Sequence, residues 1–242
     1  MTASTPDASQ RTAARVVGFS YLFAMVAANV AEFGVHAHLL VSGDAAATAH
    51  NILAHERLWR LGIACNLLCM TTDLALIAAL YVILSRVHQG LALFATCSRV
   101  VETSVFVVVI LNDFDVLRIV SGADHLQAFG AEQVQALARL SLGAYGAGYG
   151  VGLILFGLGS AAFGVLWFKS RYIPRLLAAW GVFASLLVAA GSLTLIVFPN
   201  LSSLLIPGYF LPVFLFEIIM GFWLLIKGLR PAASAGRDPA RA

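Results

Sequence analysis

Four ionisable residues interrupt long apolar stretches of this 242-residue sequence. They are Asp73, Arg99, Glu102 and Glu217. A charge at the centre of a bilayer costs about 2.5–3.5 kcal/mol on insertion scales, so such residues face the interior of a helix bundle. Arg99 and Glu102 have the i,i+3 spacing that lets them pair on one helix face. Three acids and one base leave an excess of negative charge, so we expect a protonated carboxyl or a bound cation.

This midplane charged site has two interpretations. In the structural one, Arg99 with Glu102 or Asp73 forms a buried salt bridge that fixes the register of the helices. In the functional one, the group binds an ion, a proton or a small polar or cationic ligand, and the excess of carboxylates favours this reading. A polar stripe that includes Asn66 and ends at Asp73 is typical either of a water-accessible cavity or of hydrogen bonds between helices.

Glu32 and His36 form a second polar group, at the end of the first apolar stretch. Their i,i+4 spacing can place two ligands on one metal, but a metal site needs three or four, so we predict no metal. Glu32, His36 and Asn66 are secondary candidates for a binding site. The sequence contains no G-x-S-x-G, H-E-x-x-H or Walker motif, and we predict no catalytic residue and no cofactor.

The composition indicates the elements that hold these residues. Hydrophobic residues make up 60% and charged residues 11% of the chain, with a mean hydropathy of +0.90. Soluble domains carry about 25% charged residues, so the polar surface here is too small to face water. We predict an all-α polytopic transmembrane helix bundle of about six spans, with two short outer-surface helices and the lipid bilayer as its partner. The basic residues are dispersed, which argues against nucleic-acid binding.

A span needs about 20 apolar residues. The predicted spans cover residues 14–33, 59–85, 89–115, 140–168, 174–198 and 208–228. They form one domain over 13–229, between a disordered N-terminus, 1–12, and a disordered tail, 230–242. The last two spans divide one apolar stretch that is broken at Pro199-Asn200 and Pro207-Gly208. The connections 42–56 and 123–140 are predicted to form the two outer-surface helices.

Lysine and arginine are distributed unevenly between the two sides of this topology. Ten lie on the side of the termini and four on the other, which predicts that both termini are cytoplasmic. The fourth span is rich in glycine and contains the small-xxx-small pairs Gly148/Gly152 and Ser160/Gly164. Such pairs let helices approach closely, and a homo-oligomer through this helix is one expected use.

Several segments resemble the uncharacterised bacterial membrane family known as domain of unknown function 4386. The most specific are SGDAAATAHNILAHERLWRLGI at 42–63 and SGADHLQAFGAEQVQALA at 121–138. Further similarity lies at 31–33, 148–158, 173–181 and 216–228, so the resemblance covers nearly everything from Arg11 to Gly228. It implies a multi-helix protein of the bacterial inner membrane and supplies no activity.

Three functions are therefore compatible with the sequence. The first is small-solute or proton-coupled transport through the midplane charged site. The second is a non-catalytic accessory or sensor protein with a structural buried salt bridge. The third is an intramembrane enzyme for a lipid-like substrate that uses Glu32, His36, Asp73 or Glu217. Transport and accessory roles are favoured over catalysis, and the deciding feature is whether a cavity joins Asp73, Arg99 and Glu217.

Overall fold

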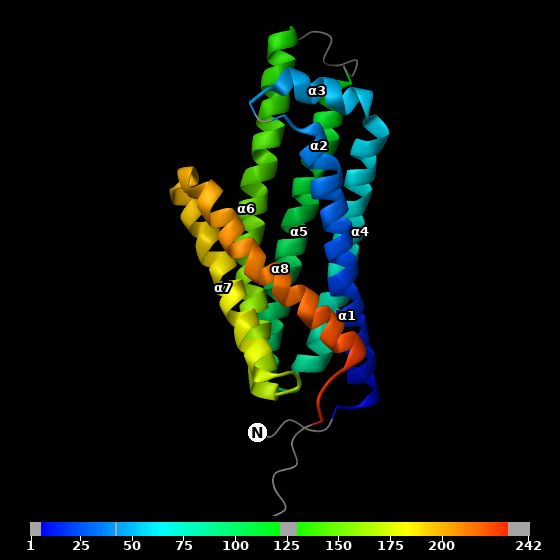
Figure 1. The fold of residues 1–242 in the computed structure, drawn as a ribbon, viewed down its shortest axis with the longest axis vertical. Coiled ribbons are helices and arrows are strands. Elements are labelled where there is room, and N and C mark those ends of the chain that lie inside the picture. Colours follow the sequence, from blue (N-terminus) through cyan, green and yellow to red (C-terminus); the bar gives the residue numbers. More distant parts are fainter. Residues whose placement is uncertain (1–5, 42, 122–129, 232–242) are drawn as a thin grey trace, which may run out of the picture.

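The fold is a bundle of long helices. The computed structural model describes residues 6–41, 43–121 and 130–231, and these residues form helices and connections without any strand. Within this described part, six helices are long and apolar enough to cross a membrane. They run alternately up and down the long axis of the molecule (Figure 1). The predicted all-α polytopic membrane fold is confirmed.

The first span is a continuous helical rod built from α1 (Ala8–Asn29), the π-helical segment η1 (Val30–His36) and α2 (Ala37–Leu39). The other spans are α4 (Glu56–Leu84), α5 (Gln89–Val120), α6 (Ala131–Ser170), α7 (Arg175–Val197) and α8 (Ser202–Ile226). The short helix α3 (Ala45–Ala54) lies across one end of the bundle, the α3 end (Figure 1). We call the opposite end, where α1 begins and α8 ends, the terminal end.

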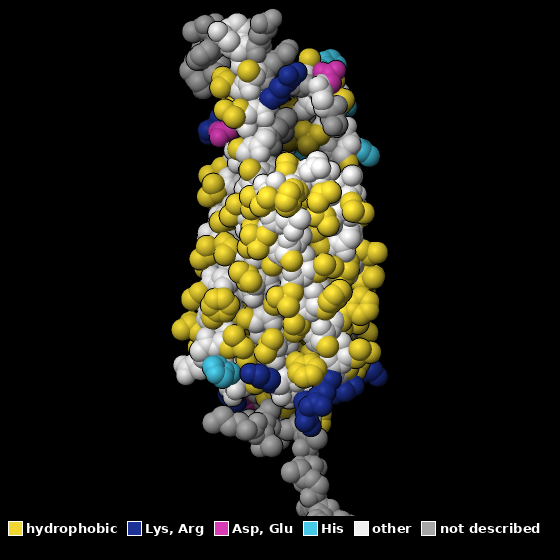
Figure 2. Space-filling model, turned by 90° about the vertical axis from the view of Figure 1, so that its left-hand side faces the viewer, with side chains coloured by type: hydrophobic (Ala, Val, Ile, Leu, Met, Phe, Trp, Pro, Cys, Tyr) yellow, Lys and Arg dark blue, Asp and Glu magenta, His cyan; other side chains and the backbone are white. Residues whose placement is uncertain are grey.

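Neighbouring helices close into a ring. Helix α1 packs between α4 and α8, α5 packs between α4 and α6, and α7 packs between α6 and α8. Large apolar side chains such as Leu176, Leu204 and Phe33 remain more than three-fifths exposed. On the face drawn in Figure 2, apolar side chains form a broad band, with charged side chains gathered above and below it. Lipid is the solvent that such a surface requires.

Helix α1 begins at Ala8, inside the stretch that the sequence assigns to a disordered terminus. Asp7 is the reason, because its Oδ1 accepts a hydrogen bond from the Gln10 backbone N–H at 2.8 Å while the Gln10 side chain accepts from the Asp7 N–H. The Gln10 Nε2 also donates to the Ile83 carbonyl, and Arg86 pairs with Asp7 at 2.6 Å. The Gln10 N–H and Arg86 together lower the pKa of Asp7.

Helix α8 differs from its prediction. The chain breaks only once after α7, at the 3₁₀ turn η3 (Pro199–Leu201), and Pro207 and Pro212 lie inside α8. Each proline lacks the N–H that would bond to the carbonyl four residues earlier in the helix. Lipid offers this carbonyl no hydrogen-bond donor, whereas a neighbouring helix can supply one. Trp180 of α7 holds α8 at this point, because its Nε1 donates to the Pro212 carbonyl at 2.9 Å.

The two connections at the α3 end have different outcomes. The helix predicted within 42–56 is confirmed as α3, and Asp44 caps it by accepting from the Ala47 N–H at 2.9 Å. Residues 122–129 of the other connection lie outside the described residues. From Ala131 onward this connection forms the first turns of α6 and not a separate helix. No glycine or proline interrupts the chain between Gly130 and Gly143, so nothing ends the helix there.

Candidate functional site

Arg99 lies at the centre of the first candidate site. It is ten positions into α5, so its Cα is about 15 Å along the helix from the terminal end. The hydrocarbon core of a bilayer is about 30 Å thick, which puts Arg99 near its middle. The Arg99 side chain is 5% exposed. A cation at this depth has to be neutralised by its neighbours.

The neighbours of Arg99 come from three helices. Its Nη2 lies 3.4 Å from Asp73 Oδ2 of α4, and its Nε lies 3.5 Å from Glu102 Oε2 on α5 itself. Its Nη1 donates to Ser160 Oγ of α6 at 3.4 Å, and the guanidinium carbon lies 4.4 Å from the centre of the Phe156 ring. Strong charge-assisted hydrogen bonds measure about 2.7–2.9 Å. One guanidinium is thus shared loosely among several acceptors.

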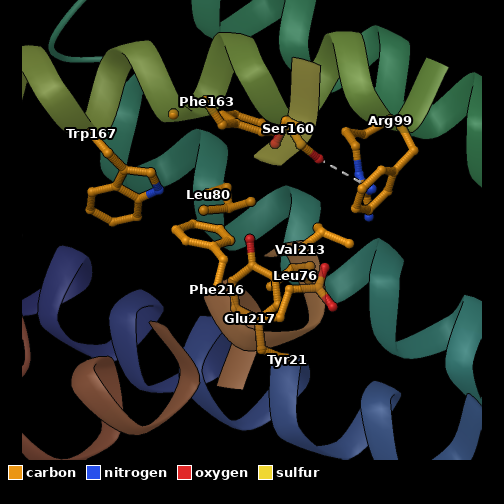
Figure 3. Close-up of a pocket in the computed structure, with 13 residues that line it drawn as sticks. Tyr21, Leu76, Leu80, Arg99, Ser160, Phe163, Trp167, Val213, Phe216 and Glu217 are labelled. Atoms are coloured by element: carbon orange, nitrogen blue, oxygen red, sulfur yellow. Dashed lines mark hydrogen bonds between the residues drawn. The ribbon is translucent and has the colours of Figure 1, made fainter. Parts of the chain in front are cut away.

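Glu217 of α8 completes the site from the opposite side of a small cavity. In Figure 3, Arg99 and Ser160 lie on one side of this cavity, and Glu217 and Tyr21 lie on the other. Its volume is about 10 Å³, which is enough for about one water molecule. Among the described residues, no cation pairs with Glu217. Of the three residues that one cavity was expected to join, Arg99 and Glu217 line this water-sized space and Asp73 does not.

The charges within this site do not cancel. Arg99 is the cation, and Asp73, Glu102 and Glu217 are three carboxyl groups around it. The side chains of Arg99 and Glu102 are 5% and 1% exposed, and that of Asp73 is 13% exposed. Burial penalises the ionised form of each group that lacks its own partner. The arrangement can therefore hold a proton on a carboxyl group.

His36 forms the centre of a second polar group near the α3 end. It ends the π-helical segment η1, a widened turn of a kind that is often found at functional sites. Its Nδ1 lies 3.3 Å from Glu32 Oε2, and its Nε2 lies 3.6 Å from Asp113 Oδ2 of α5. The imidazole is buried between the rings of Trp59 and Tyr145, whose centres lie 5.1 Å and 5.4 Å away.

The two groups are separate. Arg99 and Asp113 are 14 positions apart on α5, which corresponds to about 21 Å along the helix. An enzyme that used Glu32 and His36 together with Asp73 and Glu217 would have to join groups at different depths. Asn66 is half-buried on α4 and lines neither of the two cavities described here.

Asp113, Ser160, Phe156 and Tyr21 are the participants that sequence reasoning missed. Asp113 follows an apolar stretch in the sequence Asn-Asp-Phe-Asp, which is typical of a helix leaving the membrane. Asp115, two residues later, fits this interpretation because its side chain is 52% exposed, whereas that of Asp113 is 2% exposed. Only the direction of each side chain on the helix separates the two. The i,i+4 spacing of Ser160 and Gly164 predicts a close helix contact but does not predict the hydrogen bond from Arg99 to Ser160.

The glycines of α6 let neighbouring helices approach the site. Gly152 faces Phe106 of α5, Gly159 lies against Arg99, and Gly157 and Gly164 face α7. Three others, Gly143, Gly146 and Gly150, have open space where a Cβ would lie. The predicted contact with a second copy through this helix stays a prediction, but Gly152 and Gly164 of the small-xxx-small pairs already face α5 and α7 within the bundle.

Comparison with known proteins assigns the chain to a family. Neither the curated proteins nor the solved structures contain a match to it. The family model described as Domain of unknown function (DUF4386) matches residues 16–228, a range that holds both polar groups and all six spans apart from the first turns of α1. The chain is thus a multi-pass integral membrane protein that belongs to the family of the domain of unknown function DUF4386.

Proposed function

We propose that this protein couples the movement of a small polar or cationic solute to a proton held by a cluster of four side chains. We call this cluster the Arg99 group; it consists of Arg99, Asp73, Glu102 and Glu217. The observation that carries the proposal is the charge imbalance: three carboxyl side chains surround one guanidinium at mid-membrane depth. An uncompensated negative charge is costly at this depth, so a proton neutralises one carboxyl group. The proton stays until a cation replaces it or a helix movement releases it. Glu217, which has no cationic partner among the described residues, is the proposed proton carrier.

The shape of α8 supports this assignment. Pro207 and Pro212 remove two backbone hydrogen bonds from α8 before it reaches Glu217. A helix that is weakened in this way bends more easily than an uninterrupted one. Movement of α8 would change the distance between Glu217 and Arg99, and with it the affinity of Glu217 for a proton.

A second candidate is an accessory or sensor protein in which the Arg99 group fixes the helix positions. The cavity favours it, because about 10 Å³ admits no solute larger than water. Leu76, Phe163 and Phe216 fill the remaining walls with apolar side chains. In this candidate the proton would stay on its carboxyl throughout.

Infrared spectroscopy and transport measurements separate the two candidates. At neutral pH we expect the wild-type protein to show the carbonyl band of a protonated carboxylic acid, which weakens in Glu217→Gln. In proteoliposomes with an imposed proton gradient, we expect uptake of at least one member of a panel of labelled amino acids and organic cations. The double variant Asp73→Asn/Glu217→Gln should abolish that uptake, because neither side chain can then exchange a proton.

Glu56→Gln is the matched control. Glu56 is an exposed acid on α4 that pairs with Arg60 at 2.7 Å, well away from Asp73 along the same helix. Its replacement should leave both the infrared band and the uptake unchanged. Transport would be rejected if uptake across the whole panel were equal in the wild type and the double variant, and the structural candidate would then be preferred.

We also propose that the terminal end faces the cytoplasm of a bacterium, with the chain in the inner membrane. Eight of the lysines and arginines among the described residues lie at the terminal end: Arg11, Arg15, Arg86, Lys169, Arg171, Arg175, Lys227 and Arg230. Only Arg57, Arg60, Arg118 and Arg139 belong to the other end of the described chain. Such a bias predicts orientation. A C-terminal fusion to green fluorescent protein should fluoresce and one to alkaline phosphatase should be inactive; the reverse pair of results would contradict the orientation.

A further inference from the structure

A cavity of about 360 Å³ opens beside His36, at the α3 end of the bundle. It is far larger than the water-sized space at Arg99 and has the size of a small organic molecule. Its walls include the aliphatic side chains of Leu40 and Val41 and the rings of Trp59 and Tyr145. Asp113 is 24 positions into α5, about 36 Å from the terminal end and thus past a 30 Å hydrocarbon core. The cavity is therefore at the depth of the membrane–water interface.

Asp113 is the unusual member of this cavity. Its side chain is 2% exposed, and its Oδ2 has no hydrogen-bond donor within reach among the described residues. His36 Nε2 lies 3.6 Å from that oxygen, which is beyond hydrogen-bond distance. A buried carboxylate without a donor is costly, so this oxygen needs a partner that none of the described residues supplies.

His36 supplies part of the positive charge that Asp113 needs. Its Nδ1 lies 3.3 Å from Glu32 Oε2 and its Nε2 lies 3.6 Å from Asp113 Oδ2, and two flanking carboxylates favour an imidazolium with a hydrogen on each ring nitrogen. One imidazolium against two carboxylates leaves one negative charge uncompensated. At 3.6 Å the Nε2–H does not hydrogen-bond to Asp113 Oδ2, so this oxygen can still accept from a donor in the cavity that Asp113 lines.

The charges around the cavity call for a cation. Glu32 and Asp113 flank His36 with two carboxylates. Two of the arginines at this end already have acidic partners, since Arg60 pairs with Glu56 at 2.7 Å and Arg118 with Asp115 at 3.5 Å. The Trp59 and Tyr145 rings add faces that attract organic cations.

We infer that this cavity binds the ammonium group of a small organic amine, with Asp113 as its counter-ion and Trp59, Tyr145, Leu40 and Val41 around its apolar part. A metal ion fits less well. Among the described residues no group of three or more histidine, cysteine, aspartate or glutamate side chains converges, and a metal site needs three or four ligands. The site lies about 21 Å from Arg99, so the inference stands or falls independently of the proton-coupled function.

Calorimetric titration of the full-length protein in lipid nanodiscs tests the inference. The probes are phenethylammonium and its neutral analogue, phenethyl alcohol, with empty nanodiscs as the blank. We expect phenethylammonium to bind at least about tenfold more tightly than the alcohol, because both can donate a hydrogen bond to the carboxylate but only the cation also neutralises its charge. Asp113→Asn should weaken the binding of the cation by about 10- to 100-fold and leave that of the alcohol unchanged.

Asp115→Asn is the matched control, since Asp115 lies two positions away and is 52% exposed. It should not alter either affinity. Glu32→Gln removes a 58% exposed charge, and should weaken binding of the cation by about two- to fivefold. This variant tests the site even if Asp113→Asn fails to fold.

Three results would overturn the inference. One is that the wild type binds neither probe, and another is that Asp115→Asn weakens phenethylammonium as much as Asp113→Asn does. The third is that Zn²⁺ binds in an Asp113-dependent way while phenethylammonium does not, which would make the cavity a metal site.

Discussion

Replacing Arg99 by methionine is expected to lower the free energy of unfolding by about 3–5 kcal/mol. The substitution keeps much of the length of the side chain but removes the only cation among the described residues that Asp73 and Glu102 contact, at 3.4 Å and 3.5 Å. The stranded carboxyl groups must then be protonated to stay buried. The loss should therefore grow as the pH rises, because a higher pH favours the unfolded state, in which these groups ionise in water. Unfolding in mixed micelles of a mild and a denaturing detergent measures the effect.

Arg60→Met is the control for this prediction. Arg60 makes the shorter ion pair, at 2.7 Å to Glu56, but both side chains are about half exposed. Exposed pairs contribute about 0–1 kcal/mol, so the control should be nearly neutral. A double variant Arg99→Met/Glu102→Met should recover part of the loss, because it removes one stranded acid together with the base. Equal effects of Arg99→Met and Arg60→Met would contradict the assignment of Arg99 to a buried charged site.

Gly157→Ala is expected to destabilise the bundle by about 3 kcal/mol, at the upper end of the cost of overpacking. A Cβ at this position would lie 2.5 Å from the Ser185 carbonyl oxygen and 2.7 Å from the Ala189 backbone nitrogen. Both are backbone atoms of α7, so no side-chain rotation relieves the contact and the two helices must separate. The change in the same unfolding assay should be accompanied by faster hydrogen exchange in α7.

Gly150→Ala in the same helix should have the opposite sign. Nothing lies within 4 Å of a Cβ at Gly150, so the substitution adds only the helix propensity of alanine, up to about 1 kcal/mol. If both variants changed stability by the same amount, the close approach of α6 and α7 at Gly157 would be wrong.

Much of the architecture could be predicted from the sequence, because the hydrophobic effect acts on stretches and not on single contacts. Stretches of about 20 apolar residues predict spans wherever they occur, and the Asp44 cap of α3 is a local signal. The errors lie at element ends. The start of α1 is held by contacts with the end of α4, where Gln10 bonds to the Ile83 carbonyl, and by the ion pair between Arg86 and Asp7. The continuity of α8 through Pro207 depends on the helices packed around it.

For the candidate site, the amino-acid types alone show which residues cannot face lipid. Asp73, Arg99, Glu102 and Glu217 were identified because the cost of a charge in hydrocarbon depends on residue type and depth alone. The sequence does not show which of these side chains contact one another. Contacts between α4, α5, α6 and α8 depend on how each helix is rotated and packed. The same holds for Asp113. Its burial beside His36, and the exposure of Asp115 two residues later, follow from the face that α5 turns toward its neighbours.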